Sequence, residues 1–126
     1  MPRERELLML RIVLILSLLC YATTLQAQNL PRLLQVISPD CHSCRFLQSE
    51  LNSLRSLDAG RLTIDTLNIA KEPAEAQQLK VYMVPTLIFF DINGKELFRH
   101  HGEWSAAEIR RKWHELGVEL YAGPGH

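Results

Sequence analysis

The chain has 126 residues with 14 basic and 14 acidic side chains, so its formal net charge at neutral pH is zero. This length is enough for one domain, and no shift in composition along the chain indicates a second. Because basic residues are interspersed with acidic ones and form no stripe, the charge pattern excludes the proteins that bind nucleic acid through a basic surface.

The first 27 residues are typical of a targeting segment. Arg3 and Arg5 precede an apolar stretch that Arg11 interrupts and that then runs over 12–22. That run is short for a membrane span and has the length of a signal-peptide core, with small residues after it. We therefore expect residues 1–27 to be a signal peptide, with an uncleaved N-terminal anchor as the alternative. Export predicts a periplasmic or otherwise extracytoplasmic protein, in a compartment where disulfides persist.

The next segment predicts a strand followed by a helix. Residues 33–37 are an apolar run that Ser38-Pro39 ends, as expected for a buried strand. Asp40 then stands where the N-cap of a helix is expected, and Gly60 ends that helix. The apolar residues of the helix recur at helical spacing and include Leu47, Leu51 and Leu54.

Two cysteines stand where this helix begins, in Cys41-His42-Ser43-Cys44, and no other cysteine follows the N-terminal segment. Thiols three residues apart on a first helical turn lie on one face and can close a small disulfide ring. Backbone N–H groups and the helix dipole at such a position favour the thiolate, which is the reactive form. The spacing and its context therefore predict a disulfide that opens and closes.

The residues beside the two thiols tune the thiolate. A protonated His42 would stabilise a thiolate at Cys41, whereas the negative charge of Asp40 would oppose it. Ser43 is the other residue between the cysteines. Since the helix dipole and His42 oppose Asp40 with effects of similar size, the sequence leaves the sign of the net effect open.

Two other interpretations of the cysteine pair stay open. A purely structural disulfide is one, although so short a loop would constrain the unfolded chain little. A metal site is the other. A closed zinc site needs four ligands, and the chain has no second cysteine pair. A copper-binding or metallochaperone module that uses Cys41, Cys44 and His101 remains the alternative function.

The middle of the chain predicts a second strand and a short helix. Leu62 and Ile64 alternate with polar neighbours, as in a strand with one buried face. The alternation then shifts to Leu67 and Ile69, which predicts an irregularity or a strand end between the two pairs. A proline at the first position favours a helix over 73–79.

The last part of the chain predicts a hairpin and a final helix. Thr86–Phe90 is apolar on both faces, as in a central strand, and Asn93-Gly94 signals a turn into a strand over Lys95–His101. Ser105 and Glu108 have the spacing of a capping box before an amphipathic helix. The order βαβαββα predicts an α/β fold in which helices flank a four-stranded mixed sheet on both faces.

Two motifs at matching places carry a family resemblance. Residues 38–44 at the end of the first strand and Val84-Pro85-Thr86 at the start of the third resemble the thioredoxin-like thiol–disulfide oxidoreductases. The resemblance covers about 33–117 and implies a minimal thioredoxin-like three-layer sandwich, without an additional N-terminal strand and helix. We expect this domain to occupy 28–119, followed by a flexible tail over 120–126.

The resemblance also assigns roles to single residues. It makes Cys41 the exposed attacking thiol and Cys44 the buried resolving thiol. Pro85 matches a cis-proline that faces the disulfide, and the backbone of Val84 would pair with an extended substrate peptide. Thr86 completes the expected substrate-binding segment.

Three residues depart from the family pattern. Asp40 stands where the family commonly has tryptophan before the first cysteine, and Gln35 stands where thioredoxins bury an acid that handles protons. Thr66 falls where the lysine partner of that acid usually lies. Replacing both charged groups with neutral ones avoids a buried unpaired charge.

Together with the predicted export, the resemblance implies an enzyme that reduces disulfides of partner proteins through a Cys41/Cys44 cycle. A reductase is favoured because the chain lacks the helical insertion of the strong periplasmic oxidants. The expected partners are a substrate protein with cysteines or disulfides and a membrane thiol-electron donor. Neither a metal nor a cofactor beyond the redox-active disulfide is expected, and the membrane would be contacted only through an uncleaved N-terminal segment.

Overall fold

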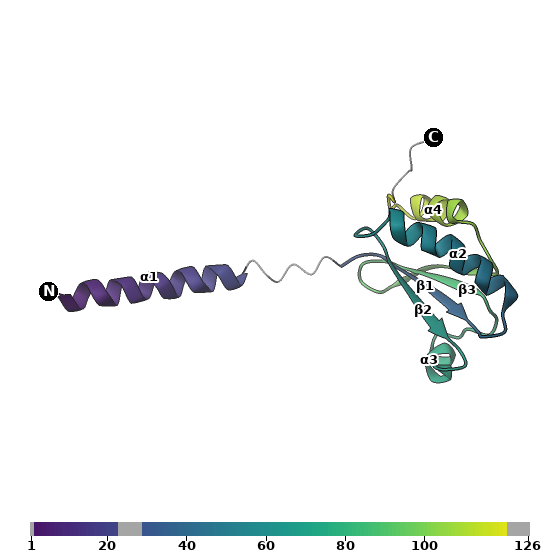
Figure 1. Ribbon diagram of the computed structural model, residues 1–126, viewed down its shortest axis with the longest axis horizontal. Helices are drawn as coiled ribbons and strands as arrows, with labels where there is room; N and C mark the ends of the chain where they lie inside the picture. Colours follow the sequence, from purple (N-terminus) through teal and green to yellow (C-terminus); the bar gives the residue numbers. More distant parts are fainter. Residues whose placement is uncertain (1, 23–28, 121–126) are drawn as a thin grey trace.

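The computed structural model describes residues 2–22 and 29–120 (Figure 1). These described residues form four helices and four strands, and from the first strand onward the elements follow the order expected from the sequence. In chain order they are α1 (Pro2–Ala22), β1 (Arg32–Ile37), α2 (His42–Leu57), β2 (Thr63–Asn68), α3 (Pro73–Gln78), β3 (Thr86–Phe90), β4 (Glu96–His101) and α4 (Ala106–Glu115).

The four strands form one mixed sheet in the order β2-β1-β3-β4. β1 pairs with β2 in parallel, because α2 carries the chain back across one face between them, and it pairs with β3 antiparallel. β3 and β4 complete the sheet as an antiparallel hairpin. β3 is buried along its whole length, which confirms it as a central strand.

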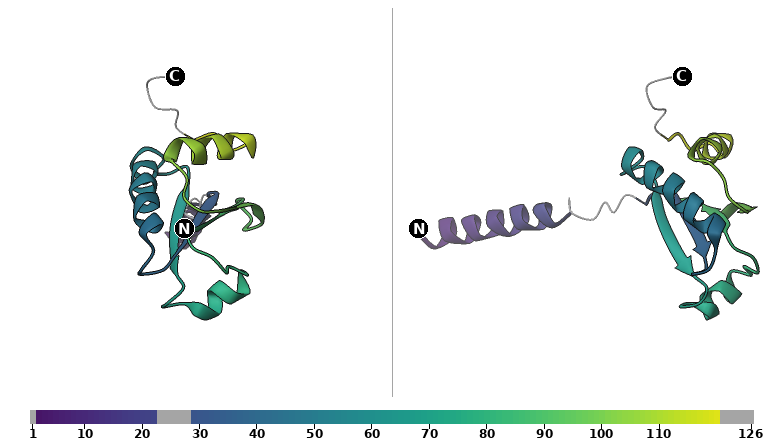
Figure 2. Two further views of the ribbon diagram at one scale, coloured as in Figure 1. Left: turned by 90° about the vertical axis from the view of Figure 1, so that its right-hand side faces the viewer. Right: turned by 45° about the vertical axis from the view of Figure 1, so that its right-hand side comes forward.

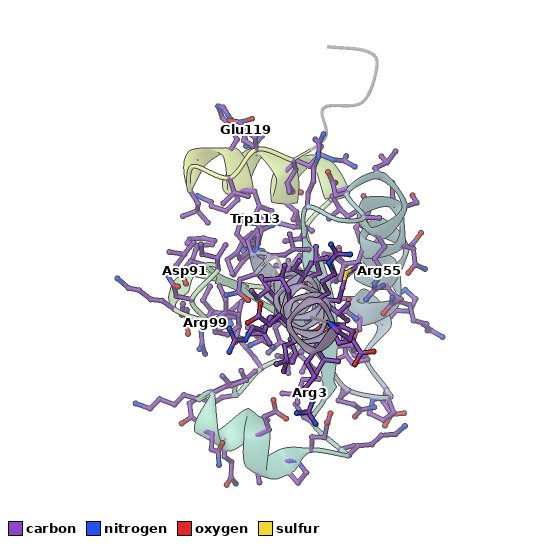
Figure 3. All side chains as sticks on the ribbon, turned by 90° about the vertical axis from the view of Figure 1, so that its left-hand side faces the viewer. Arg3, Arg55, Asp91, Arg99, Trp113 and Glu119 are labelled. Atoms are coloured by element: carbon purple, nitrogen blue, oxygen red, sulfur yellow. A yellow bond between two sulfur atoms is a disulfide. The ribbon has the colours of Figure 1, made fainter. Side chains whose placement is uncertain are left out.

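Helices cover both faces of the sheet, with α2 and α4 on one side and α3 on the other (Figure 2). Trp113 projects from α4 toward the strands and is fully buried (Figure 3). The core under α2 and α4 comprises Leu33, Leu47, Leu51, Leu54, Leu62, Leu87, Phe89, Ala106, Ile109 and Trp113. The core under α3 comprises Leu34, Val36, Leu67, Ala76, Val81, Ile88 and Phe90. The three-layer α/β sandwich is therefore present.

The irregularity predicted in the second strand is wrong. β2 pairs with β1 without a break from Arg32 opposite Thr63 to Ile37 opposite Asn68. Ile64 packs against the core under α2 and α4, whereas Leu67 belongs to the core under α3. The shift in alternation arises because this edge strand contributes apolar side chains to both faces, and it needs no bulge.

The predicted hairpin turn is present with one more residue than a two-residue turn. The N–H of Asp91 donates to the carbonyl of Lys95, and the N–H of Gly94 donates to the carbonyl of Asp91. Only Gly94 has a positive φ in this turn, at 80°. A type I turn followed by a left-handed glycine matches these features, and this longer turn is the reason that β4 begins at Glu96.

Residues 2–22 of the predicted targeting segment form α1. Within 2–22 and 29–120, no helix combines the length and the apolar character that crossing a membrane requires. Residues 23–28, which include the end of the predicted signal peptide at 27, and residues 121–126 of the predicted tail lie outside the described residues.

Candidate active site

The site begins where β1 turns into α2. Ser38, Pro39 and Asp40 form a turn that brings the N–H of Cys41 within 3.4 Å of the Ser38 carbonyl. Proline suits the second position of such a turn because its φ is already set. The N-cap of α2 is Cys41, with φ −87° and ψ 108°, so the prediction of Asp40 as N-cap is wrong. Asp40 belongs to this turn, so the N-cap falls one residue after it, at Cys41.

A disulfide joins Cys41 and Cys44, whose Cα atoms are 5.2 Å apart. The two sulfurs lie in different environments. Cys41 is partly exposed at the helix start, whereas Cys44 is only 5% exposed on the face of α2 that contacts the sheet. Cys41 Sγ also accepts a hydrogen bond of 3.1 Å from the backbone N–H of Cys44. One sulfur can therefore meet another molecule while the other stays inside.

A cation lies on the first turn of α2, and sequence reasoning did not identify it. Arg45 Nη2 lies 2.9 Å from His42 Nδ1. A guanidinium only donates hydrogen bonds, so His42 Nδ1 accepts this one and carries no proton. Arg45, four residues after Cys41, therefore brings a positive charge to this turn of the helix. That i,i+4 spacing was the available signal.

The polar group beneath the helix is neutral. Gln35 is fully buried in β1, and its Nε2 donates a hydrogen bond of 2.8 Å to Gln48 Oε1 on α2. Gln48 follows Cys44 by one helical turn, so this pair lies next to the buried cysteine along the helix. Thr66 is exposed and stands opposite Gln35 in the sheet. The two positions where thioredoxins have an acid and a lysine thus carry an amide and a hydroxyl in this chain.

The segment before β3 lies at the same end of the sheet as the loop that leads to the cysteine pair. The Val84–Pro85 peptide bond is cis, as the resemblance implied. Val36 at the end of β1 stands opposite Thr86 at the start of β3, so Pro85 lies at the end of the sheet from which the chain continues to Cys41. Among the described large apolar residues of the domain, Tyr82 is the most exposed, at 85%. This end therefore offers both a thiol and an apolar surface.

The structure does not bring His101 to the cysteine pair. His101 stands opposite Thr86, which stands opposite Val36 of the core under α3, so its side chain belongs to that face of the sheet. The cysteines lie on α2, which covers the other face. Over 2–22 and 29–120 no three histidine, cysteine or acidic side chains are grouped as metal ligands would be. The residues of the copper alternative are thus separate.

His100 points to the opposite face from His101. Its ring stacks on Trp104, with 3.7 Å between ring centroids, and Trp104 in turn stacks on Phe98 at 5.9 Å. Burial is the main cause that lowers the pKa of His100 below the ordinary value of 6.5. His100 is therefore part of the packing under α4.

Comparisons with known proteins agree with this architecture. A family model described as a thioredoxin-like domain matches residues 22–116. A search of curated proteins finds no match.

Solved structures share the fold at low sequence identity. A malarial protein is 20% identical, with a TM-score of 0.66 over 69% of this chain and 97% of its own. Thioredoxin-2, a component of malaria parasite protein secretion machinery, is 18% identical, with a TM-score of 0.67 over 74% and 89%. Chloroplastic thioredoxin z is 17% identical, with a TM-score of 0.65 over 77% and 87%.

Proposed function

Because the chain belongs to the thioredoxin-like domain family, we propose that it is an exported thiol–disulfide oxidoreductase that reduces disulfides of partner proteins. The observation that carries the proposal is the Cys41–Cys44 disulfide at the start of α2, with one sulfur partly exposed and the other buried. A purely structural disulfide would need neither one exposed and one buried sulfur nor a place at the start of a helix. A disulfide that closes so short a loop would also stabilise the fold little.

The reduced dithiol would act in two displacements. The Cys41 thiolate attacks one sulfur of the substrate disulfide, that S–S bond breaks, and the departing substrate thiolate takes a proton. A mixed disulfide now joins Cys41 to the substrate. The Cys44 thiol then loses its proton and attacks Cys41 Sγ, which releases the second substrate thiolate. Two electrons pass to the substrate and the Cys41–Cys44 disulfide forms. One substrate thiol gains the proton that Cys44 loses, and the other gains a proton from water in place of the one that Cys41 released on ionising.

Local electrostatics support Cys41 as the attacking group. As N-cap, its sulfur already accepts the Cys44 N–H, and this hydrogen bond would strengthen toward a thiolate. The positive end of the helix dipole and the guanidinium of Arg45 act in the same direction. The burial of Cys44 instead favours its neutral thiol until the mixed disulfide forms.

The direction of electron flow and the compartment are also part of the proposal. Between β2 and β3 the chain has only the six-residue helix α3, which supports a reductase because the strong periplasmic oxidants carry a helical insertion there. A reductase in an oxidising compartment must be re-reduced, and a membrane thiol-electron donor would supply the two electrons. The apolar segment over 12–22 supports export.

Insulin reduction in the presence of a dithiol donor tests this proposal. The wild-type chain should accelerate it, Cys41→Ser should abolish the acceleration, and Cys44→Ser should accumulate a mixed disulfide at Cys41 that mass spectrometry detects. Cys20→Ser, made in the full chain with its N-terminal segment retained, is the matched control and should keep full activity. Equal rates for wild type and Cys41→Ser would refute the proposal.

A further inference from the structure

Thr86 joins the segment that precedes β3 to the end of β4. It is fully buried and directly follows the Val84–Pro85 cis bond. Its Oγ1 donates a hydrogen bond of 2.7 Å to the carbonyl of Met83. The same oxygen lies 3.1 Å from His101 Nδ1. One hydroxyl therefore contacts both the chain before the proline and a side chain of the neighbouring strand.

The hydrogen count fixes the direction of both bonds. The Thr86 hydroxyl has a single hydrogen, and a carbonyl oxygen such as that of Met83 can only accept it. The Thr86 oxygen must then be the acceptor toward His101, whose Nδ1 carries the hydrogen. His101 thereby directs the Thr86 hydrogen to Met83.

A second bond holds the same segment from the same strand end. The N–H of Gly102 donates a 2.8 Å hydrogen bond to the carbonyl of Pro85. Residues 83–86 are thus tied to consecutive residues at the end of β4, one tie through a side chain and one through the backbone. The side chain of Met83 itself is 55% exposed, so the restraint acts on the backbone.

We propose that His101 is a positioning residue for substrate, which holds residues 83–86 in the conformation that presents the Val84 backbone to an extended peptide. This inference rests on the proposed function and concerns only how that site receives a protein. An added strand binds through backbone groups, so its affinity depends on how rigidly the receiving segment is held. A small disulfide makes no strand contact and does not require the restraint.

Two substrates and two variants test the role. With pre-reduced protein, His101→Ala should raise the half-saturating concentration of insulin about three- to tenfold, the range expected for one lost hydrogen bond. The limiting rate should stay unchanged, as should the rate with hydroxyethyl disulfide. His101→Asn should restore insulin binding because its amide nitrogen replaces Nδ1. His114→Asn, an exposed histidine on α4, is the matched control and should match wild type.

A spectroscopic readout separates positioning from a merely structural effect. Nitrogen NMR of the neutral wild-type protein should show the His101 proton on Nδ1, and Thr86→Val should remove that preference. Adding His101→Ala to Thr86→Val should weaken insulin binding no further, because both changes break one connection. Unchanged insulin binding in His101→Ala, or additive effects, would overturn the inference. A wild-type protein that reduces neither substrate would instead refute the proposed function.

Discussion

At the scale of single residues, the Cys41 sulfur combines two roles that usually belong to different side chains. It caps α2 by accepting the Cys44 N–H, as serine or aspartate oxygens do, and it is also half of the disulfide. Opening the disulfide would leave the thiolate with a donor already in place. The helix start is therefore organised around sulfur, which explains why Asp40 is not needed as a cap.

The charge of Arg45 should speed the reaction of reduced Cys41. At an exposed i,i+4 position its attraction to a thiolate is partly screened, so Arg45→Gln should slow alkylation of Cys41 at pH 7 about threefold. Iodoacetamide kinetics on the reduced protein measure this rate. Arg55→Gln, near the other end of α2, is the control and should match wild type; a faster reaction in Arg45→Gln would contradict the assignment.

A carboxyl group placed at position 35 without a lysine at position 66 should destabilise the fold. Gln35→Glu places a carboxyl at a fully buried position, and we expect it to lower the free energy of unfolding at pH 7 by about 2 kcal/mol or more. Urea denaturation measures this, with Gln77→Glu on the surface of α3 as the control for the same chemical change. Adding Thr66→Lys should restore part of the loss, and an unaltered stability in Gln35→Glu would contradict this account.

The sequence predicted the residues whose chemistry is tied to chain position and missed those whose role needs a partner in space. The cysteine pair and Pro85 follow from spacing and motif. The hydrogen bond from His101 to Thr86 joins residues that only the β3–β4 register brings together. Arg45 was missed for a simpler reason, because a charge on an exposed first turn resembles ordinary surface.

At the scale of elements, the start of α4 shows how a helix is anchored beside the site. Glu108 accepts the backbone N–H of Ser105 at 2.8 Å, and the hydroxyl of Ser105 accepts the N–H of Glu108 at 3.3 Å. The next N–H, that of Ala106, donates to Glu50 on α2 at 2.7 Å. α4 is thus capped locally and tied to the helix that carries the cysteines.

The capping carboxylate should make stability depend on pH. The backbone N–H of Ser105, and then its hydroxyl, lower the pKa of Glu108 below its ordinary value of 4.5. The folded chain thus binds this proton less readily than the unfolded chain, so the stabilisation is complete above that value and is lost as pH falls through the lowered pKa. Glu108→Gln should be less stable than wild type at pH 7, with a difference that closes at lower pH in urea titrations. A pH-independent difference would contradict this reasoning.

The elements themselves were largely predictable, and the errors have physical causes. The capping box and the buried run of β3 are local signals that tertiary structure reinforces. β2 was misjudged because an edge strand with apolar residues on both faces imitates a break in the period. The exact turn between β3 and β4 depends on backbone angles that Asn93-Gly94 permits but does not determine.

At the scale of the whole molecule, sheet topology assembles the site. Val36, Thr86 and His101 form one row across β1, β3 and β4, and each strand meets its loop at that end. The chain leaves β1 toward the cysteines and enters β3 through the cis-proline segment. No pattern of neighbouring residues predicts that the cysteine loop and the cis-proline segment lie at the same end of the sheet. Their proximity follows once the strand order is known.

The equilibrium of the Cys41–Cys44 pair with glutathione tests the central claim most directly. Alkylation of the two thiols after equilibration in a series of glutathione buffers, read by mass spectrometry, gives the fraction of open disulfide. We predict one reversible two-electron transition, with the pair still largely closed in buffers that open strongly oxidising disulfides and fully opened by a dithiol donor. A pair that opens in those mild buffers would contradict the reductase direction. A pair that no dithiol opens would contradict the redox account itself.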